Sequence, residues 1–402
     1  MRILWVKVGG LWPINMGGRI RSFHMISALS RSNRMTVLTT HGTGDDPDGL
    51  RKQLPNCERV VSVPYAVPKR GTPGFAVSLL QSWFSEYPID VWRWRVSALR
   101  EEVRRVLDSG QVDLCVADFI FAMPNLPSGC PVPIVFFEHN VEHMIWKRLA
   151  EVEGVGWKRP LLELEWRKMR RYETRSCHRA KLTVSVSDVD RALLATHAPH
   201  ASVTAVGTGV DVEYFCPNGS MEMPATLVFT GSMDWYPNED AILYFIDAIL
   251  PKIRRRIRDI SFTVVGRNPT SVVRETAERA GVQVTGLVDD VRPFMSRAVV
   301  YVVPLRIGGG TRLKIFEALA MGKALVSTTV GAEGLPLVPG VHFLQEDDPN
   351  AFADAVVSLV QDPGRRALLG QAGRRLVEDK FSWMSIAREF EARCKEVVNH
   401  AG

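Results

Sequence analysis

Residues 303–322 read VPLRIGGGTRLKIFEALAMG, an apolar strand pattern that runs through three glycines directly into a helix pattern. Glycines let backbone N–H groups approach a ligand closely, and a helix start adds unpaired donors and the positive end of the helix dipole. Arg312 and Lys314 place cations in the first turn, where they oppose that dipole unless an anion lies nearby. The stretch therefore predicts a diphosphate site. The alternative is a plain glycine loop followed by a Lys314–Glu317 helix pair.

The alternation of strand and helix extends in both directions from this stretch. Short apolar runs alternate with amphipathic ones, which is typical of βαβ units and parallel sheets. The pattern predicts single helices over Val91–Leu107 and Glu239–Ile257, and a linker over residues 207–224, where turn formers gather. A chain of 402 residues is long enough for two such domains. We expect their ligand in a crevice between them, at the carboxyl ends of the strands.

The composition excludes several classes of protein. With 46% hydrophobic and 23% charged residues, the chain is neither disordered nor fibrous. Its six cysteines show no CxxC spacing, which argues against a disulfide framework or a zinc site and favours a reducing cytosol. No apolar run reaches the roughly 18 residues of a membrane span, and the start lacks the pattern of a signal peptide. We therefore expect a cytoplasmic protein that at most lies on a membrane.

The net charge of +6 is concentrated in one segment. Residues 141–181 hold eleven Lys or Arg against six Glu, together with Trp146, Trp157 and Trp166. Cations interleaved with tryptophans indicate contact with an anionic membrane surface, and the alternative is a solvated helix face. Nucleic acid is the weaker partner, because no recognised binding module accompanies the charge.

Further candidate residues follow the predicted strands. Gly17 and Gly18 open a helix after the first strand, although their spacing is not GxGxxG, and Arg19 and Arg21 behind them are either functional or surface residues. His139 stands in a Glu-His-Asn cluster after an apolar strand, where an imidazole can move a proton near neutral pH. Two weaker glycine turns contain Gly231-Ser232 and Gly266-Arg267. The acidic pairs look like solvated loops, so no metal site is predicted.

The ordered series of these motifs resembles the GT-B glycosyltransferases of family 4. It runs through nearly the whole chain, and the residues that carry the resemblance are Gly17-Gly18, Glu138-His139-Asn140, Tyr172-Glu173, Val186-Ser187, Gly209-Val210-Asp211, Tyr214-Phe215, Gly231-Ser232-Met233, Val265-Gly266-Arg267, and residues 308–322 followed by Ala324-Leu325-Val326-Ser327.

The resemblance implies two Rossmann-like domains that face each other across a cleft. An acceptor domain would cover residues 1–205 and a donor domain residues 206–382, and a last helix over 383–402 would cross back to the first domain. It also implies retaining transfer of a sugar from a UDP- or GDP-sugar, without a metal or other cofactor. The acceptor would be a glycan, a lipid-linked glycan or a small molecule. The resemblance thus implies a role in polysaccharide biosynthesis, either in the cytoplasm or peripherally at the inner face of the membrane.

The resemblance also assigns roles to residues. Glu317 would bind the donor ribose, and the loop of Gly309, Gly310 and Thr311 would meet the sugar and phosphates. His139 would lie near the transferred sugar and Gly17-Gly18 beside the phosphates. Gly231, Ser232 and Arg267 would complete the donor site, and Arg312 and Lys314 would stabilise the departing diphosphate.

Two departures from the family pattern leave alternatives open. Gly309 stands where the family usually has a glutamate, and Ser232 and Asn238 stand near the positions of the usual Arg and Lys. Arg312, Lys314 and Arg267 are the cations that could replace the missing charge. A non-catalytic sugar-nucleotide-binding homologue and a sugar-nucleotide epimerase are the alternative functions.

Overall fold

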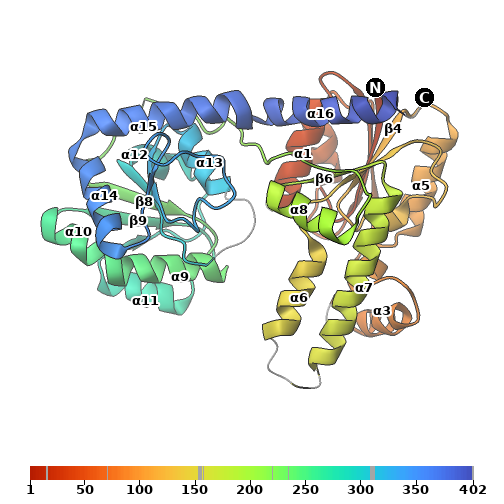
Figure 1. Cartoon of the computed structure of the whole chain (residues 1–402), viewed down its shortest axis with the longest axis horizontal. Coiled ribbons are helices and arrows are strands. Elements are labelled where there is room, and N and C mark those ends of the chain that lie inside the picture. Colours follow the sequence, from red (N-terminus) through yellow and green to blue (C-terminus); the bar gives the residue numbers. More distant parts are fainter. Residues whose placement is uncertain are drawn as a thin grey trace. The chain divides into compact units, whose positions relative to one another are not determined.

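The computed structural model describes residues 1–14, 17–69, 71–152, 156, 158–219, 221–233, 235–307 and 313–400. The chain forms two compact units, Met1–Gly207 together with Ile386–Gly402, and Thr208–Ser385. Each unit is a parallel sheet covered by helices, which confirms the expected pair of Rossmann-like domains (Figure 1).

The N-terminal unit is built on seven parallel strands in the order β3-β2-β1-β4-β5-β6-β7. The order reverses between β1 and β4, where Ile3 pairs with Met35 on one side and Leu114 on the other. Ligands of such sheets bind outside the carboxyl ends of the strands at this reversal. The strands are β1 (Arg2–Lys7), β2 (Arg34–His41), β3 (Arg59–Pro64), β4 (Leu114–Asp118), β5 (Ile134–Phe137), β6 (Leu182–Ser185) and β7 (Val203–Ala205).

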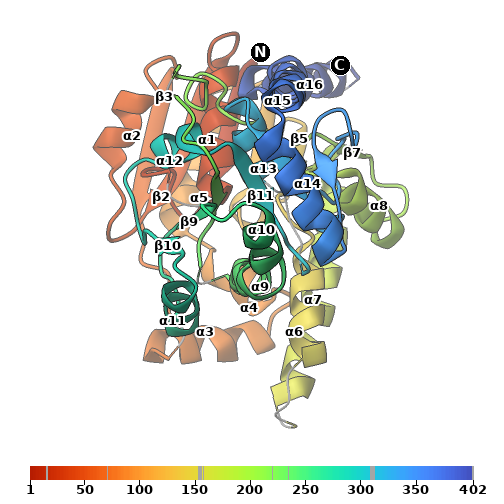
Figure 2. The same cartoon turned by 90° about the vertical axis from the view of Figure 1, so that its left-hand side faces the viewer.

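Two helices of this unit, α6 and α7, form a hairpin that extends past the sheet (Figures 1 and 2). The last helix, α16, returns to this unit, as the resemblance implies, because Phe390 packs against Trp5 and Phe137. The helices are α1 (Gly17–Leu29), α2 (Pro47–Gln53), α3 (Pro73–Trp83), α4 (Ile89–Arg93), α5 (Ser97–Asp108), α6 (Glu142–Val152), α7 (Lys158–Arg179), α8 (Asp188–His197) and α16 (Trp383–Asn399).

The C-terminal unit has six parallel strands in the order β10-β9-β8-β11-β12-β13, with the reversal between β8 and β11. Its strands are β8 (Thr226–Thr230), β9 (Ser261–Val265), β10 (Gln283–Val284), β11 (Val300–Val303), β12 (Ala324–Ser327) and β13 (Leu344–Gln345). Its helices are α9 (Tyr236–Tyr244), α10 (Leu250–Arg256), α11 (Ser271–Arg279), α12 (Arg292–Arg297), α13 (Leu313–Ala320), α14 (Pro349–Gln361) and α15 (Pro363–Leu376).

The prediction of one helix over Val91–Leu107 is wrong. The chain forms α4 and α5 instead, with Val96 in an extended conformation between them. The amide of Asn125 bridges this break, accepting a hydrogen bond from the Val96 N–H at 2.8 Å and donating one to the Trp94 carbonyl at 2.8 Å. A distant side chain thus supplies the backbone partners that a continuous helix would have supplied.

The predicted helix over Glu239–Ile257 also differs in detail. It continues from α9 to α10 through a π-helical turn at Phe245–Ile249. Pro251 is the second residue after this turn and has no N–H to donate, so the helical hydrogen-bond ladder is interrupted there.

Candidate functional site

The carboxyl ends of β1, β4 and β5 bring three ionisable side chains together in the N-terminal unit. Nε2 of His139 lies 2.9 Å from Oδ1 of Asp118, and Nζ of Lys7 lies 3.4 Å from the same oxygen. Asp118 accepts a third contact on Oδ2, a 2.8 Å hydrogen bond from the indole N–H of Trp5. All three ionisable side chains are buried. Buried charges persist only when they are paired, so Asp118 is the centre that holds Lys7 and His139 in place.

The pKa values at this cluster follow from its burial and its pairing. Burial lowers the pKa of His139 to about 4, although the nearby Asp118 carboxylate opposes that shift. Burial by itself would raise the pKa of Asp118, but Lys7 and His139 outweigh it and bring that pKa below its ordinary range. At neutral pH, His139 is therefore a neutral imidazole beside a carboxylate, suited to hydrogen bonding and not to carrying charge.

Gly18 and His139, which the sequence singled out separately, are neighbours. A Cβ at Gly18 would lie 3.7 Å from Nδ1 of His139, so the imidazole faces the first turn of α1. Among the described residues, none has an atom within 4 Å of the corresponding position at Gly17. Free N–H groups at a helix start attract anions, and this turn has no acidic residue that would compete.

Arg19 and Arg21, which follow these glycines in α1, make contacts within the protein. Arg21 is buried, its guanidinium lies 4.5 Å from the Phe137 ring centroid, and it donates to the Val206 carbonyl at 2.8 Å. Arg19 pairs with Asp45 at 2.7 Å. The alternative of two surface arginines is therefore wrong for Arg21.

Three carboxyl groups are buried around Glu138, the residue before His139. Glu138, Glu142 and Glu173 are all less than a tenth exposed. Glu173 accepts from the backbone N–H of Glu142 at 2.8 Å and contacts Nδ1 of His143. Neither carboxyl oxygen of Glu138 has a hydrogen-bond partner among the described residues. Burial raises the pKa of Glu142 to about 8, and burial with the neighbouring carboxylates raises that of Glu138 well above its usual range.

We expect the stability of the N-terminal unit to fall as pH rises from about 6 to 8.5. In the folded chain Glu142 keeps its proton up to a pKa of about 8, whereas a solvated glutamate loses it near 4.3. The folded state then binds more protons, so this stabilisation is complete below the unfolded pKa and is lost as pH rises through the folded one. The urea midpoint, followed by tryptophan fluorescence, should therefore fall over this window. In Glu142→Gln the fall should be smaller. A wild-type midpoint that rises with pH over the same window would contradict the assignment.

In the C-terminal unit, the turns after β8 and β9 approach each other closely. A Cβ at Gly266 would lie 1.7 Å from the Gly231 carbonyl oxygen, so only glycine fits there. Nε of Arg267 donates to Oγ of Ser232 at 2.9 Å. The exposed Arg267 guanidinium thus stands beside the serine that replaces a cation of the family pattern.

Lys314, from α13, reaches the same edge of the sheet. Its Nζ donates to Oδ1 of Asn238 at 2.6 Å and lies 4.1 Å from the Phe229 ring centroid. Nδ2 of Asn238 donates in turn to the Ser232 carbonyl at 2.7 Å. A Cβ at Gly231 would lie 2.7 Å from Nζ of Lys314, so the ammonium group fills the space that this glycine leaves. Hydrogen bonds therefore connect Lys314, Asn238, Ser232 and Arg267.

Glu317 lies one helical turn after Lys314 and is partly buried. Burial raises its pKa to about 7, although the Lys314 charge opposes that shift. Its carboxylate makes no hydrogen bond with any residue that the structure describes, whereas the neighbouring Tyr301 hydroxyl is engaged with Thr230. A carboxylate without a donor in a largely dry site can accept hydrogen bonds from ligand hydroxyls.

Four predicted site residues, Gly309, Gly310, Thr311 and Arg312, lie outside the described residues, and their roles stay predictions. The described chain also contains no group of three or more His, Cys, Asp or Glu placed to hold a metal ion.

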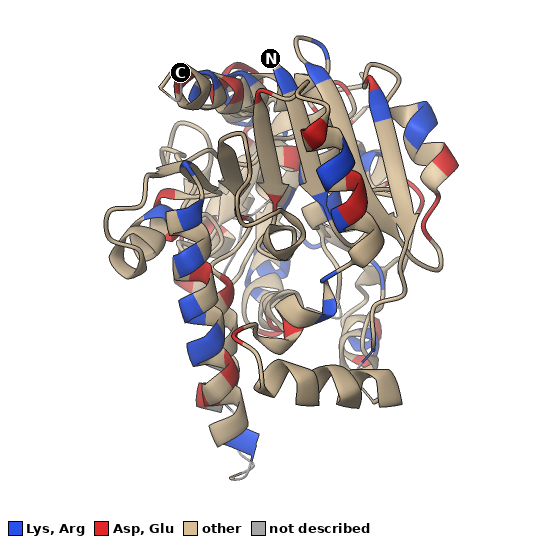
Figure 3. Ribbon diagram, turned by 90° about the vertical axis from the view of Figure 1, so that its right-hand side faces the viewer, with Lys and Arg blue, Asp and Glu red and all other residues tan. Residues whose placement is uncertain are grey.

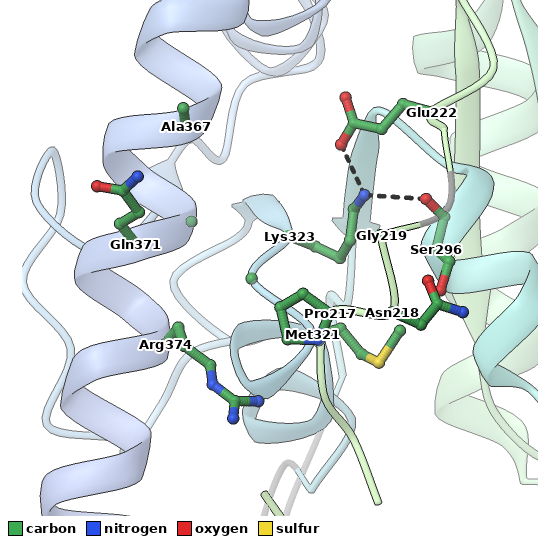
Figure 4. A pocket seen from close by; sticks show the side chains of 12 residues that line it. Pro217, Asn218, Gly219, Glu222, Ser296, Met321, Lys323, Ala367, Gln371 and Arg374 are labelled. Carbon is green, nitrogen blue, oxygen red and sulfur yellow. Dashed lines mark hydrogen bonds and ion pairs between the residues drawn. The ribbon is translucent and has the colours of Figure 1, made fainter. Parts of the chain in front are cut away.

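A pocket of about 300 Å³ opens at the other edge of this sheet (Figure 4). Lys323 and Ser296 line it, and both precede the strands β12 and β11, so the pocket is at the amino ends of the strands. Glu222 pairs with Lys323 at 2.7 Å and with Arg366 at 3.3 Å. The pocket is therefore distinct from the sheet edge at which Gly231, Arg267 and Lys314 lie.

Two functional candidates were missed from the sequence. Asp118 ends β4 as His139 follows β5, so the strand-end argument that selected His139 would also have selected Asp118. Asn238 was recognised only as a departure from the family pattern, and nothing in the sequence indicated its contact with Lys314.

Two family models match consecutive parts of the chain. Residues 17–214 match the model of glycosyltransferase family 4, and residues 224–362 match that of the group 1 glycosyl transferases. The chain belongs to the family-4 type of glycosyltransferases. Together the two matches leave only short segments uncovered, and they meet close to the division between the two compact units.

Individual relatives share only part of their sequence with this chain. The chain is 28% identical over 230 residues to the phosphatidyl-myo-inositol mannosyltransferase of Mycolicibacterium smegmatis, an alignment that covers 54% of this chain and 58% of the relative. The match thus spans little more than half of that relative's length.

Solved structures show the fold. The sucrose-phosphate synthase of Thermosynechococcus elongatus superposes with a TM-score of 0.68 at 16% identity over 99% of both chains. HepE of Anabaena, solved with UDP, gives a TM-score of 0.67 at 13% identity over 98% of this chain and 100% of its own. This likeness over both units confirms the GT-B fold.

Proposed function

We propose that this chain transfers a sugar from a UDP- or GDP-sugar to a hydroxyl group of a glycan, lipid-linked or small-molecule acceptor. The observation that carries the proposal is that one sheet edge holds both the Lys314 ammonium group and the Glu317 carboxylate, which makes no hydrogen bond with any described residue. A nucleoside diphosphate needs both, a carboxylate that accepts from the ribose hydroxyls and cations that attract the phosphates.

The proposed transfer proceeds with retention and without a metal. The bond between the sugar C1 and the diphosphate oxygen breaks, the acceptor oxygen forms its bond on the same face, and the acceptor proton passes to the departing phosphate. Lys314 and Arg267 would stabilise the negative charge that grows on this leaving group, together with Arg312 and the 308–311 loop. The neutral His139 would orient the donor sugar from the N-terminal unit.

The proposed acceptor has a lipid part, and the proposed location is the cytoplasmic face of a membrane. The support is the relative named for phosphatidyl-myo-inositol, together with the basic and tryptophan-rich segment 141–181. In the described part of the chain no helix is both long and apolar enough to cross a bilayer.

A transfer assay distinguishes the three functions. The chain is incubated with radiolabelled UDP- and GDP-sugars, with and without a membrane lipid extract, in EDTA, and products are separated into lipid, free sugar and nucleotide sugar. We expect label in the lipid fraction, with an α-linked product from an α-linked donor. Isomerised donor without acceptor would identify an epimerase, and donor binding without any product would identify a non-catalytic homologue.

A further inference from the structure

Three helices of the N-terminal unit bury polar side chains and expose apolar ones. The clearest case is α3, which carries no charged residue. Its buried residues are Ser78 and Ser82, whereas Leu80 is 54% exposed and Phe84, directly after the helix, is 92% exposed. A helix that packs on a core normally turns its apolar face inward. In α3, Phe75 and Leu79 pack partly against the core, and the other large apolar residues are turned outward.

Helix α7 also exposes large apolar residues. Its buried face holds Glu165, Lys168 and Glu173 together with apolar residues such as Met169, while Leu161 and Leu164 are exposed. The inward charges have partners, since Glu165 accepts from the Ile89 N–H at 2.8 Å and Lys168 donates to the Ser82 carbonyl at 2.6 Å. These polar contacts fix the inward face. Leu161 and Leu164 stand four positions before Glu165 and Lys168 on the same side of the helix, and they are exposed because this end of the hairpin extends past the sheet.

Helix α6 is similarly mixed. It buries Glu142 and His143 together with Trp146 and Ala150, and it exposes Ile145 and Leu149. The Lys168–Ser82 contact joins α7 to α3, and α6 packs along α7. These three helices form what we call the exposed apolar surface, whose residues are Val77, Leu80, Trp83, Phe84, Ile145, Leu149, Leu161 and Leu164.

Cations accompany these apolar residues. Figure 3 shows blue residues along α7 next to the uncharged α3. Arg159 and Arg167 flank the two exposed leucines of α7 and are each 59% exposed, and Arg171 and Arg175 continue the row. Glu163 lies between Arg159 and Arg167 and offsets only part of their charge.

We propose that the exposed apolar surface docks on an anionic lipid bilayer, with α3 lying in the interface and the α7 arginines contacting the headgroups. This deepens the membrane contact of the proposed function by assigning its apolar part to α3, outside residues 141–181. Apolar side chains combined with cations match the boundary between headgroups and acyl chains. A second copy of the chain fits less well, because it would bring the same row of arginines against itself.

Vesicle flotation tests the docking. The full chain is mixed with vesicles of 70% phosphatidylcholine and 30% phosphatidylglycerol, and with pure phosphatidylcholine. We expect binding to the anionic vesicles that weakens as salt is raised. The double variant Leu80→Gln and Phe84→Gln should lower the partition coefficient at least about tenfold at every salt concentration, because it removes apolar area that the bilayer would bury. The pair Arg167→Glu and Arg171→Glu should lower it about 30-fold or more, mainly at low salt.

The matched control replaces exposed leucines of the other unit, Leu287→Gln and Leu368→Gln, which are 79% and 71% exposed. This variant should float like the wild type. Nucleotide binding, measured on the same samples, should be unchanged in all variants, so a failure to dock is distinguishable from a failure of the proposed transferase function. Absence of wild-type flotation, equal loss in the control, or a dimer in light scattering that the α3 variant abolishes would overturn the proposal.

Discussion

Replacing Lys314 with alanine is expected to lower kcat/KM for the nucleotide sugar about 30- to 1000-fold, that is, by about 2–4 kcal/mol of transition-state stabilisation. The Lys314 ammonium group is held by Asn238 and the Phe229 ring, so its position is fixed before the donor binds. Removing a preorganised charge costs most when negative charge grows on the leaving group. We therefore expect the effect in kcat and less in KM.

The matched control for this variant is Arg306→Ala. Arg306 lies at the end of β11 on the same sheet edge, but its guanidinium pairs with Asp240 at 2.6 Å and is half-exposed. Its removal should change kcat/KM less than about threefold, and both variants should keep the wild-type unfolding temperature within about 4 °C. Equal losses in the two variants would mean that general surface charge, and not the Lys314 position, supports the reaction.

Replacing Asp118 with alanine is expected to lower the free energy of unfolding of the N-terminal unit by about 3–5 kcal/mol. The variant leaves the Lys7 ammonium group buried without its carboxylate and removes the acceptor of the Trp5 N–H. Removing one partner of a buried ion pair exposes the remaining charge to the full cost of desolvation. Urea unfolding followed by tryptophan fluorescence measures this loss.

A second acid–base pair near the other end of the same strands provides the control. Asp113 pairs with Arg2 at 2.6 Å, but both side chains are partly exposed. Asp113→Ala should therefore cost no more than about 1 kcal/mol. If the two aspartate variants lose the same stability, the central role of Asp118 is wrong.

The sequence predicts best what depends on local pattern. The alternation of apolar runs and glycine turns predicted two parallel α/β domains, which the structure has. Strand ends predicted which candidate residues lie close together, because the carboxyl ends of parallel strands meet at one edge. Gly18 and His139, far apart in sequence, are neighbours for this reason.

What the sequence did not predict depends on contacts between distant residues. The break between α4 and α5 requires Asn125, about 30 residues further along the chain. The contact of Asn238 with Lys314 joins residues 76 positions apart. The outward orientation of most apolar residues of α3 depends on the hydrogen bond that Lys168 donates to the Ser82 carbonyl. The sequence of the helix by itself is that of an ordinary apolar segment.

The binding of UDP and GDP, measured by titration calorimetry in the presence of EDTA, tests the central claim most directly. We expect one of the two nucleotides to bind the wild type, and Glu317→Gln to weaken that binding about tenfold to 100-fold, since a hydrogen bond to a charged group contributes about 1.5–3 kcal/mol. Arg306→Ala should bind like the wild type. If neither nucleotide binds, or if Glu317→Gln binds as tightly as the wild type, then this edge of the C-terminal sheet is not the donor site.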